Sequence, residues 1–193
     1  QAFLEKIPWW LPKKEKLLEL GKTKSPVYIY SKEALSKKAF DLKSIKSIDK
    51  VLFSMKANSH PDVLKCLHNA EIHFETVSLG EIKHLKKIIP TLKSSDILFT
   101  PNFISKDECK KAIQEGVTFT LDNIYPLKNW PKLFKNKSIF LRVDPGHGKG
   151  HHDYVKTAGE QSKFGILPNE LDEIEELREK NNFFIKGLHA HAG

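Results

Sequence analysis

Cysteine and methionine are scarce in this sequence of 193 residues, which contains two cysteines, Cys66 and Cys109, and one methionine. Two cysteines cannot form a disulfide framework in a chain of this size, so the sequence favours a reducing compartment, and we expect a cytoplasmic protein. No apolar run approaches the roughly 20 residues that a membrane-spanning helix needs. The first residues also lack the long apolar core of a signal peptide. We therefore expect no membrane partner.

Acidic residues are outnumbered by basic ones, 24 against 32, which leaves a formal net charge of +8. An excess of this size makes nucleic acid a candidate partner. The lysines are nevertheless spread along the whole chain, in segments such as KKEK and KHLKK, and no basic cluster is interleaved with aromatic residues. We expect no nucleic-acid partner, whereas an anionic small molecule would benefit from the same positive field.

Hairpin signals are absent, since no Asn-Gly or Asp-Gly pair joins two apolar runs. Instead, strand-like and helix-like patterns alternate. The candidate strands cover 51–56, 72–77, 96–100, 117–121, 138–144 and 184–191. The helical patterns cover 31–46, 60–70, 78–89, 105–115, 123–135 and 168–181. This alternation predicts an α/β protein with a parallel sheet, either doubly wound or a (β/α)8 barrel.

Local signals support several helix starts. Ser78 with Glu81, and Ser105 with Glu108, have the spacing of a capping box, and prolines 61 and 168 suit a first helical turn. Two segments depart from the alternation. The segment 25–30 is expected to form an additional strand outside it, and 145–167 is longer than most loops in a compact domain, which indicates a functional or disordered segment.

The candidate functional residues are polar side chains at the predicted carboxyl ends of strands, because ligands bind there in parallel α/β folds. Lys56 is expected as the last residue of a buried strand, and Glu75 lies on the second. Arg142 lies on the fifth, while His189 and His191 lie on the last. A lysine amine can bond to an aldehyde, a histidine can stack on a planar ring, and an arginine can hold an anionic oxygen. Together they suit an anionic aromatic cofactor that carries an aldehyde, such as pyridoxal phosphate.

Simpler interpretations apply to several of these features. Lysines at strand ends commonly just reach water. The segment HGKGHH contains His147, His151 and His152, so a metal site is an alternative interpretation. Asp153 is the only carboxylate at a spacing suited to metal binding, and we expect no metal. The segment GHGKG imitates a phosphate-binding loop without its Gly-Lys-Ser/Thr ending. We expect Glu81 to act in helix capping and His189 to be a packed histidine.

Five segments, in order along the chain, resemble those of barrel-type (fold type III) pyridoxal-phosphate-dependent decarboxylases. They are FSMKANSHPDVL, FETVSLGEI, LRVDPG, HHDYVKTAGEQSKFGI and GLHAHAG. The fourth follows the pattern of diaminopimelate decarboxylases in register. The opening IPWWLPKKEKLLELGKTKSPVYIY resembles the decarboxylase part of bifunctional aspartate kinase–diaminopimelate decarboxylases.

The resemblance implies a role for each matched residue. Lys56 would be the catalytic lysine that carries pyridoxal 5'-phosphate, His191 would stack on the pyridine ring, and Arg142 would lie near the phenolic oxygen. Glu75, also assigned to cofactor binding, stands where the family usually has Asp, and Leu79 replaces a glycine. The family's glycine-rich phosphate loop, its acid facing the pyridine nitrogen and its catalytic cysteine would lie beyond Gly193.

For the fold, the resemblance implies the N-terminal portion of a (β/α)8 barrel, about six of eight strands, without the family's C-terminal β-domain. We expect an N-terminal extension over 1–30 and a partial barrel domain over 31–193. The chain begins without methionine and stops directly after an apolar run, so we expect a fragment of a longer enzyme, inactive when isolated. The full-length protein is expected to be a homodimer.

The implied reaction is decarboxylation of meso-2,6-diaminopimelate to L-lysine. Decarboxylation of another basic amino acid or of carboxynorspermidine is the alternative within this class. An amino-acid racemase of the same barrel type is less favoured, because it would not need the HAHAG and SKFGI segments. A non-catalytic carrier of pyridoxal phosphate is the alternative from a different class.

Overall fold

The computed structural model of the chain describes residues 7–144 and 164–191. His147, His151 and His152, considered above as metal ligands, lie outside the described residues, as does most of the predicted long loop. The chain forms two compact units. The first contains residues 1–51 and 60–72, and the second contains residues 52–59 and 73–193.

The first unit is helical. Its elements are a short 3-10 helix, η1 (Leu11–Lys13), followed by α1 (Lys14–Lys24), α2 (Lys32–Lys43) and α3 (Pro61–Asn69). Ser31 caps α2 by accepting a hydrogen bond from the backbone N–H of Ala34 at 3.2 Å. Helix α2 is tied to the end of α3 by Lys43, which pairs with Glu71 and donates to the carbonyl of Ala70 at 3.2 Å.

Residues 25–30 were expected to form a strand, and the structure corrects this expectation. They are irregular, and Tyr28 and Tyr30 are 90% and 52% exposed. Every strand that the structure describes belongs to the second unit, so the segment has no neighbouring strand in its own unit with which to form a hydrogen-bonded ladder. The apolar alternation of SPVYIY is therefore not sufficient for a strand.

The second unit contains a six-stranded sheet in which every neighbouring pair is parallel and the strand order follows the chain. The strands are β1 (Leu52–Ser54), β2 (His73–Thr76), β3 (Ile97–Phe99), β4 (Thr118–Leu121), β5 (Ser138–Arg142) and β6 (Phe184–His189). All six predicted strands are confirmed, with slightly narrower bounds. The sequential parallel order is that of successive strands in a (β/α)8 barrel.

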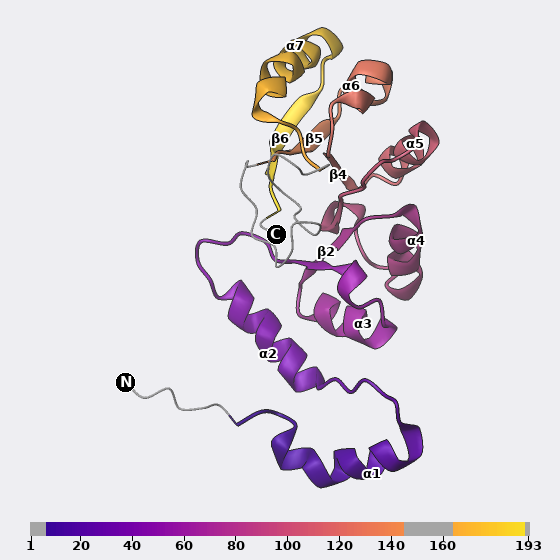
Figure 1. The fold of residues 1–193 in the computed structure, drawn as a ribbon, viewed down its shortest axis with the longest axis vertical. Helices are drawn as coiled ribbons and strands as arrows, with labels where there is room; N and C mark the ends of the chain where they lie inside the picture. Colours follow the sequence, from indigo (N-terminus) through magenta and orange to yellow (C-terminus); the bar gives the residue numbers. More distant parts are fainter. Residues whose placement is uncertain (1–6, 145–163, 192–193) are drawn as a thin grey trace. The chain divides into compact units, whose positions relative to one another are not determined.

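Four α-helices of this unit cover the outer side of the sheet (Figure 1). They are α4 (Leu79–Ile88), α5 (Lys106–Gln114), α6 (Tyr125–Asn129) and α7 (Leu171–Asn181), with 3-10 turns at Met55–Ala57 (η2), Ser94–Asp96 (η3), Pro131–Leu133 (η4) and Pro168–Glu170 (η6). The single helix predicted over 123–135 is divided at Trp130, because a residue that precedes a proline avoids the helical conformation. Ser105 and Glu108 form the predicted capping box.

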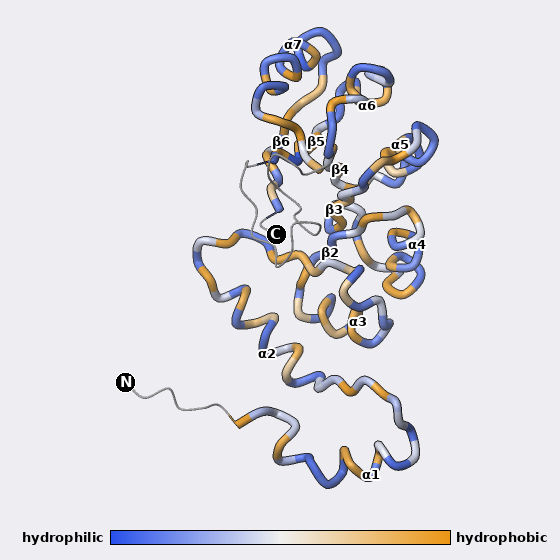
Figure 2. The backbone as a smooth tube through the Cα atoms, in the orientation of Figure 1, coloured by the Kyte–Doolittle hydropathy of each residue, from blue (hydrophilic) through white to orange (hydrophobic). Residues whose placement is uncertain are grey.

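The helix-facing side of the sheet holds the apolar core of this unit. Strand residues on this face are Phe74, Phe99, Phe119, Leu121, Ile139 and Leu141, all buried. Phe119 makes edge-to-face contacts with Phe99 at 5.4 Å and with Phe134 at 6.2 Å between ring centroids. In Figure 2, hydrophobic and hydrophilic residues alternate along helices α4 to α7, as expected for helices with one buried side. The opposite face of the sheet is polar near the strand ends.

Candidate active site

Lys56 was expected as the last residue of a strand, and the structure places it instead on the turn that follows. Strand β1 ends at Ser54, whose register partner is Glu75, and Met55–Ala57 then form η2. The turn closes when the backbone N–H of Asn58 donates to the carbonyl of Met55 at 3.1 Å. The Met55 side chain is buried, which anchors the turn and leaves the neighbouring Lys56 exposed at the carboxyl end of β1.

Glu75 is bound by two hydroxyl groups. The Ser54 hydroxyl on β1 donates to one carboxylate oxygen, and the Thr100 hydroxyl after β3 donates to the other. Hydrogen bonds to both oxygens fix the orientation of the carboxyl group. The side chain is therefore held on the polar face of the sheet, between the ends of the first and third strands.

Arg142, the last residue of β5, is 8% exposed and therefore almost buried. Its Nη1 donates to Asn102 Oδ1 at 3.3 Å, and its guanidinium carbon lies 4.9 Å from the centroid of the Phe164 ring. The side chain of Arg142 thus contacts Asn102, which follows β3, and Phe164, which lies shortly before Ile166.

The segment that brings Phe164 to this position passes close to the end of β5. Ile166 forms a parallel bridge with Val143 and exchanges backbone hydrogen bonds with Arg142 and Asp144. Gly165 has φ +92°, and a Cβ there would lie 2.8 Å from the backbone nitrogen of Asp144. Only glycine fits this position without displacing the backbone. The residues of the SKFGI motif that the structure describes therefore pack against the end of β5, the strand that carries Arg142.

His189 and His191 extend from β6 on the same side of the strand, as the two-residue spacing predicts. His189 is the register partner of Arg142. Burial lowers the pKa of His189 below its usual value, the charge of Arg142 lowers it further, and Glu75 acts in the opposite direction. Burial also lowers the pKa of His191, and the charges of Arg142 and Lys56 add to this effect. Both imidazoles are therefore favoured in the neutral form.

The four residues that the sequence singled out are brought together. Lys56, Glu75 and Arg142 each lie close enough to His191 for their charges to change its pKa. They lie at or just beyond the carboxyl ends of β1, β2, β5 and β6, and these ends share one edge of the sheet because its strands are parallel. Ser78 and Glu81 take part in helix capping as predicted: Ser78 Oγ accepts from the N–H of Glu81, whose carboxylate accepts from Val77.

The structure adds three residues that the sequence analysis missed: Asn102, Thr120 and Asp122. Asn102 contacts Arg142, and Asp122 follows β4 with only 5% of its surface exposed. Thr120 lies within β4 on the polar face and is 1% exposed. A polar residue at or just beyond the end of an apolar strand was the available signal, and it was applied to the other strands but not to β3 and β4.

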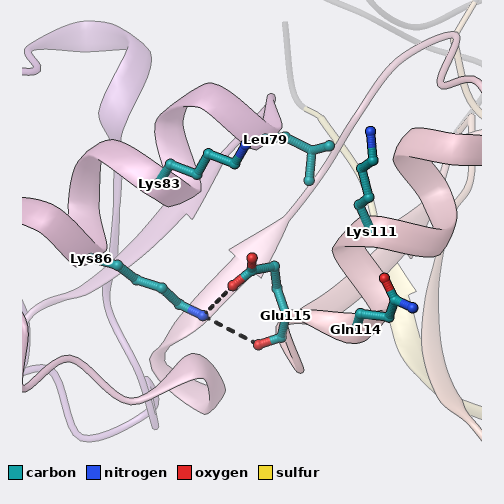
Figure 3. Close-up of a pocket in the computed structure, with 6 residues that line it drawn as sticks. All are labelled: Leu79, Lys83, Lys86, Lys111, Gln114 and Glu115. Carbon is teal, nitrogen blue, oxygen red and sulfur yellow. Dashed lines mark hydrogen bonds and ion pairs between the residues drawn. The ribbon is translucent and has the colours of Figure 1, made fainter.

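A separate pocket lies between α4 and α5, on the helical side of the sheet (Figure 3). Its volume is about 380 Å³, and it is lined by Leu79, Lys83, Lys86, Lys111, Gln114 and Glu115. Lys86 is already paired with Glu115 at 2.6 Å, while Lys83 and Lys111 are exposed. These lysines belong to the solvated polar surface of two amphipathic helices, and no strand-end residue lines the pocket.

Within residues 7–144 and 164–191, no three histidine, cysteine, aspartate or glutamate side chains are grouped closely enough to hold a metal ion. In the same part of the chain, no helix is both long enough and apolar enough to cross a membrane.

Comparison with known proteins places this site in a family context. Residues 29–193 match the family model described as "Pyridoxal-dependent decarboxylase, pyridoxal binding domain". The diaminopimelate decarboxylase of Buchnera aphidicola subsp. Baizongia pistaciae is 28% identical over 176 residues, which cover 90% of this chain and 41% of that protein. The chain thus spans less than half the length of this relative.

Solved structures agree with this match. The crystal structure of diaminopimelate decarboxylase from Helicobacter pylori complexed with L-lysine superimposes with a TM-score of 0.79 at 26% identity, covering 92% of this chain and 47% of that one. The arginine decarboxylase of Paramecium bursaria Chlorella virus has a TM-score of 0.76 at 20% identity, covering 94% and 48%, and shows likeness of fold. The six strands therefore form the N-terminal part of the decarboxylase barrel, as predicted.

The polar face of the sheet fits a bound pyridoxal phosphate. Among the described residues, two buried polar atoms lack a hydrogen-bond partner, Thr120 Oγ1 and His189 Nδ1, and both lie on this face. Buried polar groups normally have a partner, so their presence here suits a polar ligand. An exposed amine, an arginine and two neutral imidazoles at the same rim match an aldehyde, an anionic oxygen and a planar ring respectively.

Proposed function

The chain belongs to the family of pyridoxal-dependent decarboxylases, of which it carries the pyridoxal-binding domain, and we propose that the full-length protein converts meso-2,6-diaminopimelate to L-lysine. In this reaction the bond between one α-carbon and its carboxylate breaks, carbon dioxide leaves, and a proton takes its place. The observation that carries the proposal is the gathering of Lys56, Glu75, Arg142 and His191 at one rim of a diaminopimelate-decarboxylase-like barrel.

Each of these residues is proposed to have one task. Lys56 would hold the cofactor through its amine, the group suited to an aldehyde. His191 would support the planar ring, and Arg142 would hold an anionic oxygen of the cofactor. Glu75, fixed by Ser54 and Thr100, supplies the negative charge beside these cations. When bound, pyridoxal 5'-phosphate supplies the electron sink for the electrons that decarboxylation leaves behind.

The organisation of the full-length protein is also a proposal. Residues 31–193 would form the first part of the barrel domain, and 1–30 would be an N-terminal extension. We propose a cytoplasmic homodimer that binds neither nucleic acid nor membrane. The two free, buried thiols of Cys66 and Cys109 support a reducing compartment. Light scattering of the full-length protein at several concentrations tests the dimer, which a mass of one chain at all concentrations would contradict.

The activity is tested with the purified full-length protein loaded with pyridoxal phosphate. Release of carbon dioxide and L-lysine from meso-2,6-diaminopimelate is the expected result. L-Arginine, L-ornithine, L-lysine and carboxynorspermidine, supplied separately, test the alternative that another basic substrate is preferred. A faster release of carbon dioxide from one of these would replace the proposed substrate.

A non-catalytic carrier of pyridoxal phosphate is the second candidate, because the described residues that face the proposed cofactor serve binding as well as catalysis. A carrier would bind pyridoxal phosphate, release it to an apo-enzyme, and liberate no carbon dioxide from any of the five substrates. Binding without turnover in the experiment above would therefore favour the carrier.

A further inference from the structure

The segment that carries Lys56 is fixed on the side of β1. Strand β1 pairs with β2 as far as Ser54 and Glu75, and the next side chain, Met55, is only 1% exposed. The turn η2 that follows is a single 3-10 turn of three residues, a conformation with poorer hydrogen-bond geometry than an α-helix. A turn this short depends for its shape on how the residues on both sides of it are fixed.

Helix α4 fixes the other side of this turn. His84 Nε2 lies 3.2 Å from the carbonyl oxygen of Ser59, three residues after Lys56. A carbonyl oxygen can only accept a hydrogen bond, so the imidazole donates from Nε2. Ser59 is the last residue of this segment in the second unit, before the chain passes to the first unit at His60. The hydrogen bond therefore fixes the backbone where the Lys56 segment ends.

The same side of α4 also contacts the backbone after β2. Glu81 accepts a hydrogen bond from the backbone N–H of Val77 at 2.7 Å, and Val77 directly follows β2. Residues three apart in a helix are neighbours on its surface, so Glu81 and His84 act from adjacent positions. Helix α4 thus links two backbone segments beside the candidate site, one that follows Glu75 and one that follows Lys56.

We propose that His84 is a positioning residue, whose hydrogen bond to the Ser59 carbonyl holds the turn so that the Lys56 amine meets the aldehyde of the bound cofactor. This inference rests on the proposed function, in that it takes Lys56 as the residue that holds pyridoxal phosphate. Lysine carries its amine on a flexible four-carbon stem. A backbone fixed on both sides limits the positions that this amine can reach, so less conformational entropy is lost when the amine bonds to the cofactor.

Two ligands separate positioning of Lys56 from a general effect on the site. Pyridoxal 5'-phosphate carries an aldehyde, which an amine can attack, whereas pyridoxine 5'-phosphate has an alcohol in its place and cannot bond to Lys56. Loss of a contact that positions Lys56 should weaken binding of pyridoxal phosphate and leave binding of pyridoxine phosphate unchanged. Loss of a contact that only supports the fold would weaken binding of both ligands equally.

The matched variants are His84→Gln and His84→Met, made in the full-length protein. Glutamine and methionine are similar in length and suit a helix equally, but only glutamine has an N–H donor. We expect His84→Met to bind pyridoxal phosphate about threefold to tenfold more weakly than wild type, the range for one lost hydrogen bond. His84→Gln should bind it within about twofold of wild type. Lys87→Ala, which changes an exposed residue later in α4, should bind as the wild type does.

Calorimetric titration of the apo-proteins with each ligand gives these affinities and needs no turnover. His84→Ala is a second variant without a donor, in case His84→Met does not fold, and it should show the same losses. Unchanged binding of pyridoxal phosphate by the variant without a donor would overturn the positioning role. An equal loss for both ligands, or failure of His84→Gln to retain binding, would also overturn it.

The wild-type protein separates this inference from the proposed activity. If it binds pyridoxal phosphate and is labelled on Lys56 after borohydride reduction, but decarboxylates no substrate, the proposed activity alone is overturned. If the label is found on another lysine, the positioning role of His84 is overturned, while release of carbon dioxide from meso-2,6-diaminopimelate would still support the activity. A wild-type protein that does not bind pyridoxal phosphate would overturn both.

Discussion

The ring of Phe140 occupies the space beside Gly187 where any other residue would place its Cβ. These two residues are register partners on β5 and β6, directly beyond the point where the register shifts between Ile139 and Phe140. A Cβ at Gly187 would lie 2.7 Å from Phe140 Cε1 and 3.1 Å from Cδ1. Since Arg142 and His189 follow two residues later on the same strands, this contact helps to set the spacing of the strands that carry them.

Gly187→Ala is therefore expected to destabilise the full-length protein by about 1–3 kcal/mol, the usual range for an added group in a packed position. Urea denaturation followed by circular dichroism measures the change. Gly80→Ala is the matched control, because a Cβ there makes only an ordinary contact, 3.7 Å from Ser78 Oγ, within helix α4. It should be neutral or stabilising by up to about 1 kcal/mol. Equal stability of Gly187→Ala and wild type would show that the Phe140 ring can move aside without penalty.

Cys109 is expected to be chemically inert in the folded protein. Its side chain is fully buried, and burial raises the pKa of the thiol to about 12. The reactive thiolate is therefore scarce at neutral pH, in addition to being inaccessible. Iodoacetamide followed by peptide mapping should leave Cys109 unmodified in the native full-length protein and modify it fully in guanidinium. Modification under native conditions at the rate of a free thiol would show that α5 opens readily.

The alternation of helices and strands could be predicted because each element has its own periodicity, which is a local property of the sequence. The same holds for the capping interactions of Ser78 and Ser105. The division of the helix before Pro131 was missed, because the helical pattern continues across Trp130 although the proline that follows is a local signal. The strand expected over 25–30 was wrong because a strand also needs a neighbour, and this requirement is not visible in six residues. The turn that carries Lys56 was also missed, because it depends on where β2 stops pairing with β1, which the sequence of the turn does not show.

The site was predicted only in part, because some of its residues lie in recognisable sequence motifs and others do not. Lys56, Arg142 and His191 lie in motifs, whereas Asn102 and Asp122 follow strands without a comparable signature. Asp122 is noticed only because it is buried, and Asn102 only because the Arg142 side chain points towards it. The contact between Arg142 and Asn102 joins residues 40 positions apart, which a local reading of the sequence does not show.

Lys56 is predicted to be the lysine that carries the cofactor. Borohydride reduction of the loaded full-length protein, followed by peptide mapping, should place the pyridoxyl group on Lys56, because its exposed amine lies at the rim beside His191. Lys56→Ala should remove the label. Lys50→Gln, which changes an exposed lysine six residues earlier, should leave it in place. Labelling of a different lysine in the wild-type protein would refute the assignment.

Chelators are predicted to have no effect on cofactor binding or turnover, because the groups proposed to hold the cofactor, Lys56, Arg142 and His191, do so without a metal ion. Dialysis of the full-length protein against EDTA, before loading with pyridoxal phosphate, should leave both properties unchanged. If activity were lost and then restored by added zinc, the histidine-rich segment 147–153 would become the candidate metal site.

The two histidines of β6 should make the folded state less stable in acid. Burial and nearby cations lower the pKa of His189 and of His191, so the folded protein favours their neutral forms. The unfolded chain binds these protons near the ordinary histidine pKa of about 6.5. The free energy of unfolding contributed by the neutral imidazoles is therefore present above about pH 6.5 and is lost as the pH falls through the lower folded pKa values.

Urea denaturation of the full-length protein between about pH 7.5 and about pH 5.5 measures this loss. His189→Asn, which cannot titrate, should reduce the pH dependence of the unfolding free energy. Arg142→Gln should reduce it to a smaller extent, because it removes a cation that faces both histidines but leaves burial, the larger cause, in place. A pH dependence that is the same in His189→Asn and wild type would mean that the imidazole is hydrated in the folded protein and that its unpartnered Nδ1 does not face a site closed to water.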